Sequence, residues 1–121
     1  MNGVRSSPVG SWAVTAVERD GRLSASLDGT SPSIDFDAEG RAHGSTGCNR
    51  FTAGYEIDGD VLRIAGAAAT RMFCTEPPRV MEQEAALLDA LGRTRRFRRD
   101  EATLELYDGA GSVVVAAMRN G

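Results

Sequence analysis

Three residues of this sequence are candidates for reactive chemistry: Cys48, Cys74 and His43, its only cysteines and its only histidine. The cysteines lack the Cys-x-x-Cys spacing of thiol-exchange sites, and together with His43 they lack the paired spacing of structural zinc sites. A cysteine–histidine nucleophile requires contact, but a spacing of five residues on a strand places Cys48 and His43 on opposite faces. We therefore expect a Cys48–Cys74 disulfide or, alternatively, two buried thiols, and an exposed His43 beside a turn.

Polar residues around Cys48 favour a structural role over chemistry. Asn49 follows Gly47, where the chain is expected to bend, and an asparagine there can hydrogen-bond backbone groups left free at a strand start. We predict such a network among Thr46, Asn49 and Thr70, with ligand binding by Asn49 as the secondary alternative. The acidic residues lack EF-hand spacing and a glycosidase signature, so we expect them to lie on solvated turns. They are Asp35, Asp37, Glu39, Glu56, Asp58 and Asp60.

One dense run of positive charge covers residues 93–99. Strand alternation places Phe97 inward and its neighbours outward, with the outer arginines at the strand ends. The arginines form a candidate patch for an anionic partner such as a lipid headgroup, a polyanion or an acidic protein. The patch consists of Arg95, Arg96, Arg98 and Arg99. We favour the interpretation of a charged strand that resists edge-to-edge aggregation, because acidic residues outnumber basic ones by 17 to 14.

Short strands must position these residues. Turn signals recur in which an acidic residue precedes glycine, as at Asp20-Gly21, Asp28-Gly29, Glu39-Gly40, Asp58-Gly59 and Asp108-Gly109. Between them the apolar residues alternate, as in residues 33–37, 51–57, 62–64 and 104–106, and residues 112–118 form a continuous apolar run. This pattern predicts an antiparallel meander of about seven to eight strands that curls into a barrel-like sheet.

Residues 77–91 instead show helical spacing of apolar side chains. Thr75 and the two following prolines form a helix-start signal, and Gly92 is expected to end the helix in a left-handed conformation. Glu84 is the one charged residue on this otherwise apolar face. The fold class is therefore mainly β (α+β), with one helix packed on the sheet before the last three strands. Large side chains expected to fill the interior are Trp12, Phe36, Phe51, Tyr55, Met72, Phe73 and Leu88.

Length and composition describe one ordinary globular domain. The 121 residues predict a flexible segment over 1–10 and a single domain over 11–121. A net charge of −3 gives no general attraction to nucleic acid, and no apolar stretch reaches the roughly 18 residues of a membrane span. We expect no cofactor, no metal and a monomer. The N-terminal residues lack the apolar region of a signal peptide, which predicts a cytoplasmic protein if the chain is complete.

The ordered combination of motifs resembles the META domain family, also called the HslJ-like family. An early tryptophan precedes a Gly-Cys-Asn segment, a glycine–aromatic strand, a Thr-x-Met-x-Cys segment, a leucine-ending helix and a Leu-x-Leu strand. The matching motif residues before the helix are Trp12, Gly47, Cys48, Asn49, Gly54, Tyr55, Thr70, Met72 and Cys74. Those from the helix onward are Glu82, Gln83, Leu87, Leu88, Leu91, Leu104 and Leu106.

The resemblance implies a small bacterial domain of envelope lipoproteins or exported proteins, associated with heat shock and antibiotic tolerance and without established catalytic residues. It therefore favours a trimmed mature domain of the cell envelope or a secreted protein. The leading hypothesis is a non-enzymatic accessory or binding module that acts through an unknown protein or envelope component. One alternative is a carrier that holds an apolar small molecule inside the barrel. A redox or hydrolytic enzyme using Cys48 or His43 has less support.

Overall fold

The computed structural model describes residues 7–120, which form one sheet of nine antiparallel strands and one helix. The strands are β1 (Gly10–Arg19), β2 (Arg22–Ala25), β3 (Ser33–Phe36), β4 (Arg41–Ser45), β5 (Arg50–Asp58), β6 (Val61–Ala69), β7 (Arg96–Arg99), β8 (Thr103–Tyr107) and β9 (Val113–Arg119). The helix α1 (Val80–Arg93) lies between β6 and β7. The predicted β-rich class, and the position of a single helix before the last three strands, are confirmed.

The sheet closes on itself. Its strand order is β2-β1-β3-β4-β5-β6-β7-β8-β9, and an additional pairing of β1 with β9 closes every strand except β2 into a ring. The predicted meander therefore curls as expected, although the strands number nine rather than about seven to eight. The short β2 pairs with β1 outside the ring, and its one large apolar side chain, Leu23, is exposed. Such a strand has no buried face and so carries no alternation signal.

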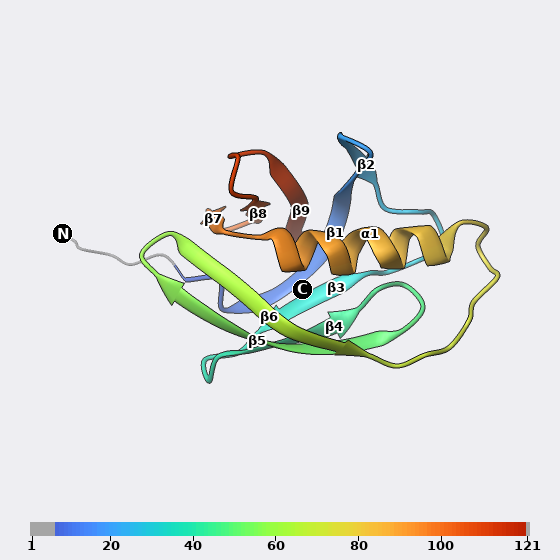
Figure 1. Ribbon diagram of the computed structural model, residues 1–121, viewed down its shortest axis with the longest axis horizontal. Coiled ribbons are helices and arrows are strands. Elements are labelled where there is room, and N and C mark those ends of the chain that lie inside the picture. The colour runs from blue at the N-terminus through green and yellow to red at the C-terminus, as the bar shows by residue number, and fades with distance from the viewer. Residues whose placement is uncertain (1–6, 121) are drawn as a thin grey trace.

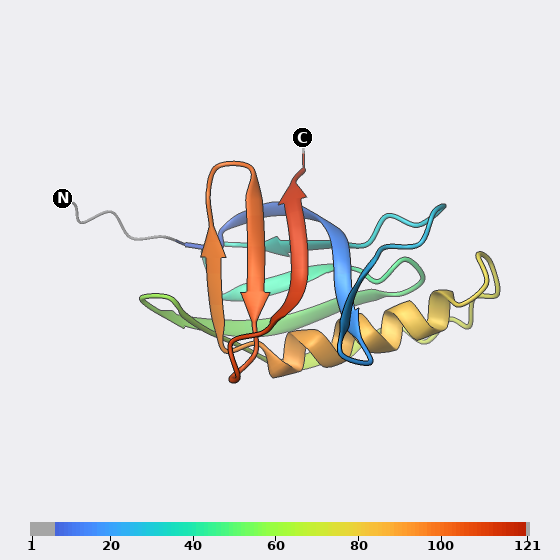
Figure 2. The same cartoon turned by 90° about the horizontal axis from the view of Figure 1, so that it is seen from above.

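Strand β1 joins two differently oriented parts of the ring. Its first residues pair with β3 and its later residues with β9, and the register shifts between Val14 and Ala16. A bulge of this kind bends a strand and increases its twist. Figure 2 shows the result: β1 curves from the layer that contains β3–β6 to the layer of β7–β9, whose strands run nearly perpendicular.

The helix begins and ends differently from the sequence-based expectation. The two prolines precede it, and Arg79, in the left-handed conformation with φ 74°, stands at its N-terminal cap without a side-chain capping bond. Gly92 lies inside the helix rather than ending it. The end comes at Thr94, whose backbone is extended and whose hydroxyl donates to the carbonyl of Ala90 at 2.9 Å. Helix α1 packs against β1, β6 and β9 beside the ring (Figure 1).

Trp12, Phe36 and Phe51 are buried inside the ring, as predicted. The prediction for Met72 and Phe73 was wrong, because these side chains are 61% and 80% exposed. Both belong to the connection from β6 to α1, which runs along the surface (Figure 1). Tyr55 and Leu88 are half-buried against the core. Branched aliphatic residues of the sheet and helix fill the remaining interior: Ile34, Leu62, Leu87, Leu91, Leu104, Leu106, Val114 and Val115.

The start of the described chain packs against the ring. The Trp12 Nε1–H donates to the carbonyl of Pro8 at 2.9 Å, and the Arg99 guanidinium donates to the carbonyls of Ser7 and Val9 at 3.0 and 3.1 Å. Arg99 also stacks over the Trp12 ring, 4.7 Å from its centroid. Of the segment 1–10 predicted to be flexible, residues 1–6 lie outside the described part of the chain.

Candidate functional site

The side chain of Asn49 is the centre of a buried hydrogen-bond network. Its amide NH₂ donates to the carbonyl of Met72 at 2.9 Å and to Oε1 of Glu84 at 2.8 Å. Its Oδ1 accepts from the Thr70 hydroxyl at 2.8 Å and from the Met72 backbone N–H at 2.7 Å. All four hydrogen-bonding positions of this amide are therefore occupied, and the residue is 1% exposed. Asn49 and Thr70 thus make hydrogen bonds of the kind that the sequence analysis expected of them.

Helix α1 supplies the partners that the sequence analysis did not anticipate. Oε1 of Glu84 also accepts from the Thr46 hydroxyl at 2.7 Å, which explains the acidic residue on an otherwise apolar helix face. The neighbouring Gln83, 4% exposed, accepts from the Leu27 N–H and donates to the Thr46 carbonyl. Gly47 has φ +101°, and a Cβ there would lie 2.7 Å from Nε2 of Gln83. The motif glycine is thus required for both its backbone conformation and its close contact.

A Cys48–Cys74 disulfide lies beside this network, with the two Cα atoms 6.0 Å apart. The two cysteines that the sequence analysis paired therefore lie at disulfide distance, and both are half-buried. The disulfide and Asn49 attach the same segment, residues 70–74, to the start of β5. A cysteine held in a disulfide offers no thiolate for nucleophilic chemistry. Motif residues Gly54 and Tyr55 lie farther along β5, where the Tyr55 hydroxyl donates to the carbonyl of Asp37.

The attached segment borders a groove between β6 and α1, which we call the β6–α1 groove. Its volume is about 840 Å³, within the range of small-ligand sites. The strand side consists of small residues, Ala67–Ala69 and Thr70, and the helix side of Met81, Glu84, Leu88 and Asp89. Met72 and Phe73 stand at its end with Asn49 and Arg71. The groove therefore brings two exposed large apolar side chains, Met72 and Phe73, next to the apolar residues of α1.

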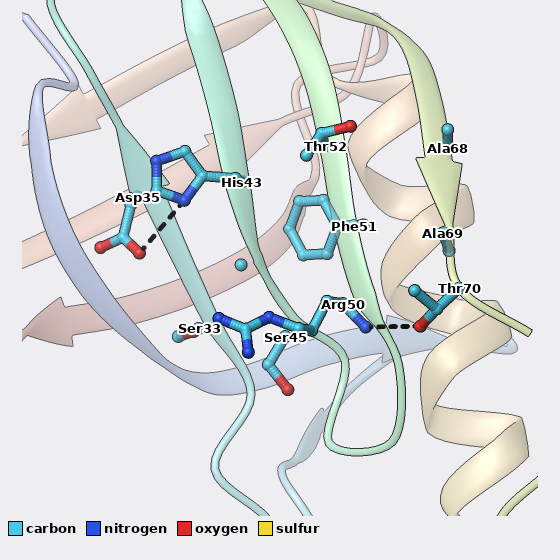
Figure 3. Close-up of a pocket in the computed structure, with 11 residues that line it drawn as sticks. Ser33, Asp35, His43, Ser45, Arg50, Phe51, Thr52, Ala68, Ala69 and Thr70 are labelled. Atoms are coloured by element: carbon cyan, nitrogen blue, oxygen red, sulfur yellow. Dashed lines mark hydrogen bonds and ion pairs between the residues drawn. The ribbon is translucent and has the colours of Figure 1, made fainter. Parts of the chain in front are cut away.

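A second hollow of about 720 Å³ lies on the outer face of β3–β6 (Figure 3). His43 Nδ1 lies 3.7 Å from Asp35 Oδ2, which is ion-pair distance but longer than a hydrogen bond. The His43 side chain is exposed, as predicted, although it stands on β4 rather than beside a turn. Arg50 also lines the hollow, and its backbone N–H donates to the Thr70 hydroxyl (Figure 3). The charged side chains that line this hollow are exposed or half-buried, so no buried polar group is positioned to bind a ligand there.

The candidate arginine patch is divided among local interactions. Arg96 forms an ion pair with Asp60 at 2.8 Å, and Arg95 donates to the carbonyls of Gly92 and Thr94. Arg98 stands opposite Glu105 in the register of β7 with β8, while Arg99 is bound to the Ser7–Val9 segment. Phe97 is buried, which confirms the predicted alternation. The arrangement fits the charged-strand interpretation better than a concentrated anionic site.

The turn carboxylates act as backbone acceptors. Oδ1 of Asp108 accepts from the N–H groups of Ala110 and Ser112, both at 3.0 Å, and the Ser112 bond lowers the pKa of this carboxyl.

Among residues 7–120, no group of three or more histidine, cysteine or acidic side chains is placed to hold a metal ion. Nor does that part of the chain contain a helix with the length and hydropathy of a membrane span.

Fold and site together define a class of small β-ring domains with one helix, in which the buried polar residues of the motif hold the structure. The META domain family model matches residues 7–121, and the chain belongs to this family. No curated protein sequence matches it. A solved structure from Burkholderia xenovorans is similar, with TM-score 0.71, 24% identity and coverage of 100% of this chain and 96% of the other.

A second similar structure belongs to a DUF4847 family protein from Bacteroides vulgatus. It aligns with TM-score 0.62 and 15% identity, and the alignment covers 93% of each chain. A further solution structure gives TM-score 0.65 at 22% identity, covering 90% of this chain and 88% of the other. At these identities the likeness concerns the fold.

Proposed function

We propose that this protein is a non-enzymatic binding module that works as a monomer in the oxidising environment of the cell envelope. Membership of the META family supports an envelope role connected with stress or antibiotic tolerance. The partner is a protein or another envelope component that contacts the β6–α1 groove. The interior offers less support for an apolar-ligand carrier, because fully buried side chains from the sheet and the helix occupy it.

The observation that carries the proposal is the rigid display of Met72 and Phe73. A surface residue that is 80% exposed, as Phe73 is, contributes little to the core. Its backbone neighbours are nevertheless fixed by a disulfide and by hydrogen bonds from Asn49. Exposed apolar side chains on a fixed segment are a feature of binding surfaces, since the ordering cost has already been met before a partner arrives.

The Cys48–Cys74 disulfide supports the choice of compartment. Disulfides persist in periplasmic and extracellular proteins and are rare where glutathione and thioredoxin keep thiols reduced. Both cysteines of the sequence belong to this bond, so an oxidising compartment leaves no unpaired thiol in the folded protein.

Site-specific photo-crosslinking in the organism that encodes the protein tests the proposal. We expect p-benzoylphenylalanine at position 73 to give discrete adducts of higher mass. The matched control is position 57, since Ile57 is also an exposed apolar residue, 42% exposed, but lies near the β5–β6 hairpin. In Figure 1 this hairpin is at the opposite end of the molecule from the β6–α1 connection.

Samples from the same cells, quenched with acid and treated with a thiol-alkylating reagent, report the redox state. Two oxidised cysteines together with adducts at position 73 alone agree with the proposal. Equal adducts at positions 73 and 57, or none at either, contradict the binding role. Two alkylated cysteines contradict the proposed compartment.

A further inference from the structure

We propose that the β6–α1 groove binds a short extended segment of a partner polypeptide, which adds as a β-strand to the free edge of β6. The inference rests on the proposed binding function and specifies the chemistry of the partner. It uses backbone hydrogen bonds for attachment and the apolar walls of the groove for selection, a recognition mode known as β-augmentation.

The edge of β6 has no strand partner along most of its length, and helix α1 lies beside it across the groove. Strand β7 pairs with it at a single position, Val61 with Arg96, and no other strand among residues 7–120 pairs on that side. The N–H of Thr70 donates to the carbonyl of Arg50, so the backbone of Thr70 faces β5. Because backbone groups alternate along an antiparallel strand, the N–H and C=O of Ala69 point away from β5.

The side chains near this edge leave its backbone accessible. Ala67 and Ala68 are exposed, and Ala69 is half-buried. Free edges are commonly protected by charged residues or proline, and positions 67–69 have neither. A register shift in the pairing with β5, where Gly66 has φ +71°, precedes this stretch. The bulge limits an added strand to a short segment.

The walls of the groove indicate which segment fits. Met81 and Leu88 of α1 and the exposed Met72 and Phe73 offer apolar contacts for side chains at alternate positions of an extended chain. Glu84 and Asp89 belong to the helix wall and outnumber the one basic lining residue, Arg71, so the groove disfavours an acidic segment. The occupant is therefore an extended, non-acidic peptide with alternating apolar residues. A second copy of this chain fits poorly, because its β6 edge is flanked by its own helix and its β2 edge offers only one large apolar side chain, Leu23.

The test begins with a displayed library of random 12-residue peptides selected on the oxidised domain. Enriched peptides are synthesised, and their affinities are measured by fluorescence anisotropy against the natural domain and two variants. Ala69→Pro removes an outward N–H of β6, whereas Ala25→Pro makes the same change on β2. Ser26 donates to Thr15, so Ala25 likewise points away from its neighbouring strand, and it provides a matched control. We expect Ala69→Pro to weaken binding at least about tenfold and Ala25→Pro to leave it unchanged.

A scan of N-methylated peptides needs no protein variant and decides the matter even if Ala69→Pro fails to fold. Added strands lose binding when alternate peptide N–H groups are methylated and keep it when the intervening ones are methylated. That alternation is the expected result. Failure to enrich any peptide, or equal effects at successive positions, overturns strand addition. Binding that is lost in Phe73→Ser but insensitive to Ala69→Pro and to methylation also overturns it, while leaving the proposed apolar binding surface intact.

Discussion

Asn49 shows how a residue type common in active sites serves structure in this protein. An amide with free hydrogen-bonding positions is available to a ligand, whereas the donors and acceptors of Asn49 are all used by Thr70, Met72 and Glu84. These partners come from the β6–α1 connection, which holds Thr70 and Met72, and from the helix, which holds Glu84. The single side chain therefore links the start of β5 to two segments that are distant from it in sequence.

We predict that Asn49→Ala lowers the free energy of unfolding by roughly 3 kcal/mol, because buried donors and acceptors lose their partner. Thermal melts check this value against Asn120→Ala, a control at an exposed asparagine that should melt like the natural protein. Asn49→Asp places a second carboxylate beside Glu84, so it should be more stable at pH 5 than at pH 7. An unchanged melting temperature in Asn49→Ala would contradict the structural role.

Sequence reasoning found half of this network. Thr46, Asn49 and Thr70 follow from their positions near glycines and expected strand ends, since such residues satisfy local backbone groups. Glu84 gave a visible signal as the one charged residue on the apolar helix face, but its partner required knowledge of how α1 docks. Met72 and Phe73 were wrongly expected in the interior, because their exposure depends on the path of the β6–α1 connection, which the neighbouring Cys74 disulfide and the Asn49 hydrogen bonds fix.

At the scale of elements, local signals predicted strands well and helix ends poorly. Acid–glycine pairs correctly predicted turns, as at Gly40 with φ +87°, because a residue with positive φ is a local requirement of the turn. After β8 the positive φ occurs at Gly111 instead of Gly109, since the hydrogen bonds of Asp108 define a longer loop. Gly92 was expected to end α1, but tertiary packing extends the helix past it to Arg93.

The turn aspartates predict how stability depends on pH. Backbone N–H groups of Arg41, Ala102 and Ser112 donate to Asp37, Asp100 and Asp108 respectively, and these bonds lower the pKa of each carboxyl below the usual 3.8. Folded-state pKa values below the unfolded value mean that this contribution is complete well above pH 3.8 and is lost as the pH falls further. The melting temperature should therefore fall most steeply below about pH 4.

The triple substitution of these residues by asparagine tests the assignment. Asparagine keeps an acceptor oxygen but does not titrate, so the triple variant should lose less stability between pH 7 and pH 2 than the natural protein. Asp28→Asn provides the control, because Asp28 is an exposed turn residue without a side-chain hydrogen bond in the described part of the chain. If the acid transition of the triple variant matched that of the natural protein, other carboxylates would carry the effect.

At the scale of the molecule, the ring and the disulfide have separate tasks. Nearly all large buried side chains face the interior between the strands and α1, while the disulfide lies at the surface connection after β6. The closed ring needs long-range pairing of β1 with β9, which no local pattern in the sequence specifies. Because the disulfide lies outside this core, we expect the core to fold without it, although with reduced stability.

We predict that reduction lowers the melting temperature by about 10 °C and leaves the domain folded at 25 °C. Closing a loop with a sequence separation of 26 residues is worth about 3.5 kcal/mol in the chain-entropy description. Thermal melts with and without a phosphine reductant measure the effect. The double variant Cys48→Ser/Cys74→Ser should have the melting temperature of the reduced protein, and the reductant should not change it. Unfolding of the reduced protein at room temperature would instead mean that the ring core depends on this bond, which would place the disulfide among the determinants of the fold.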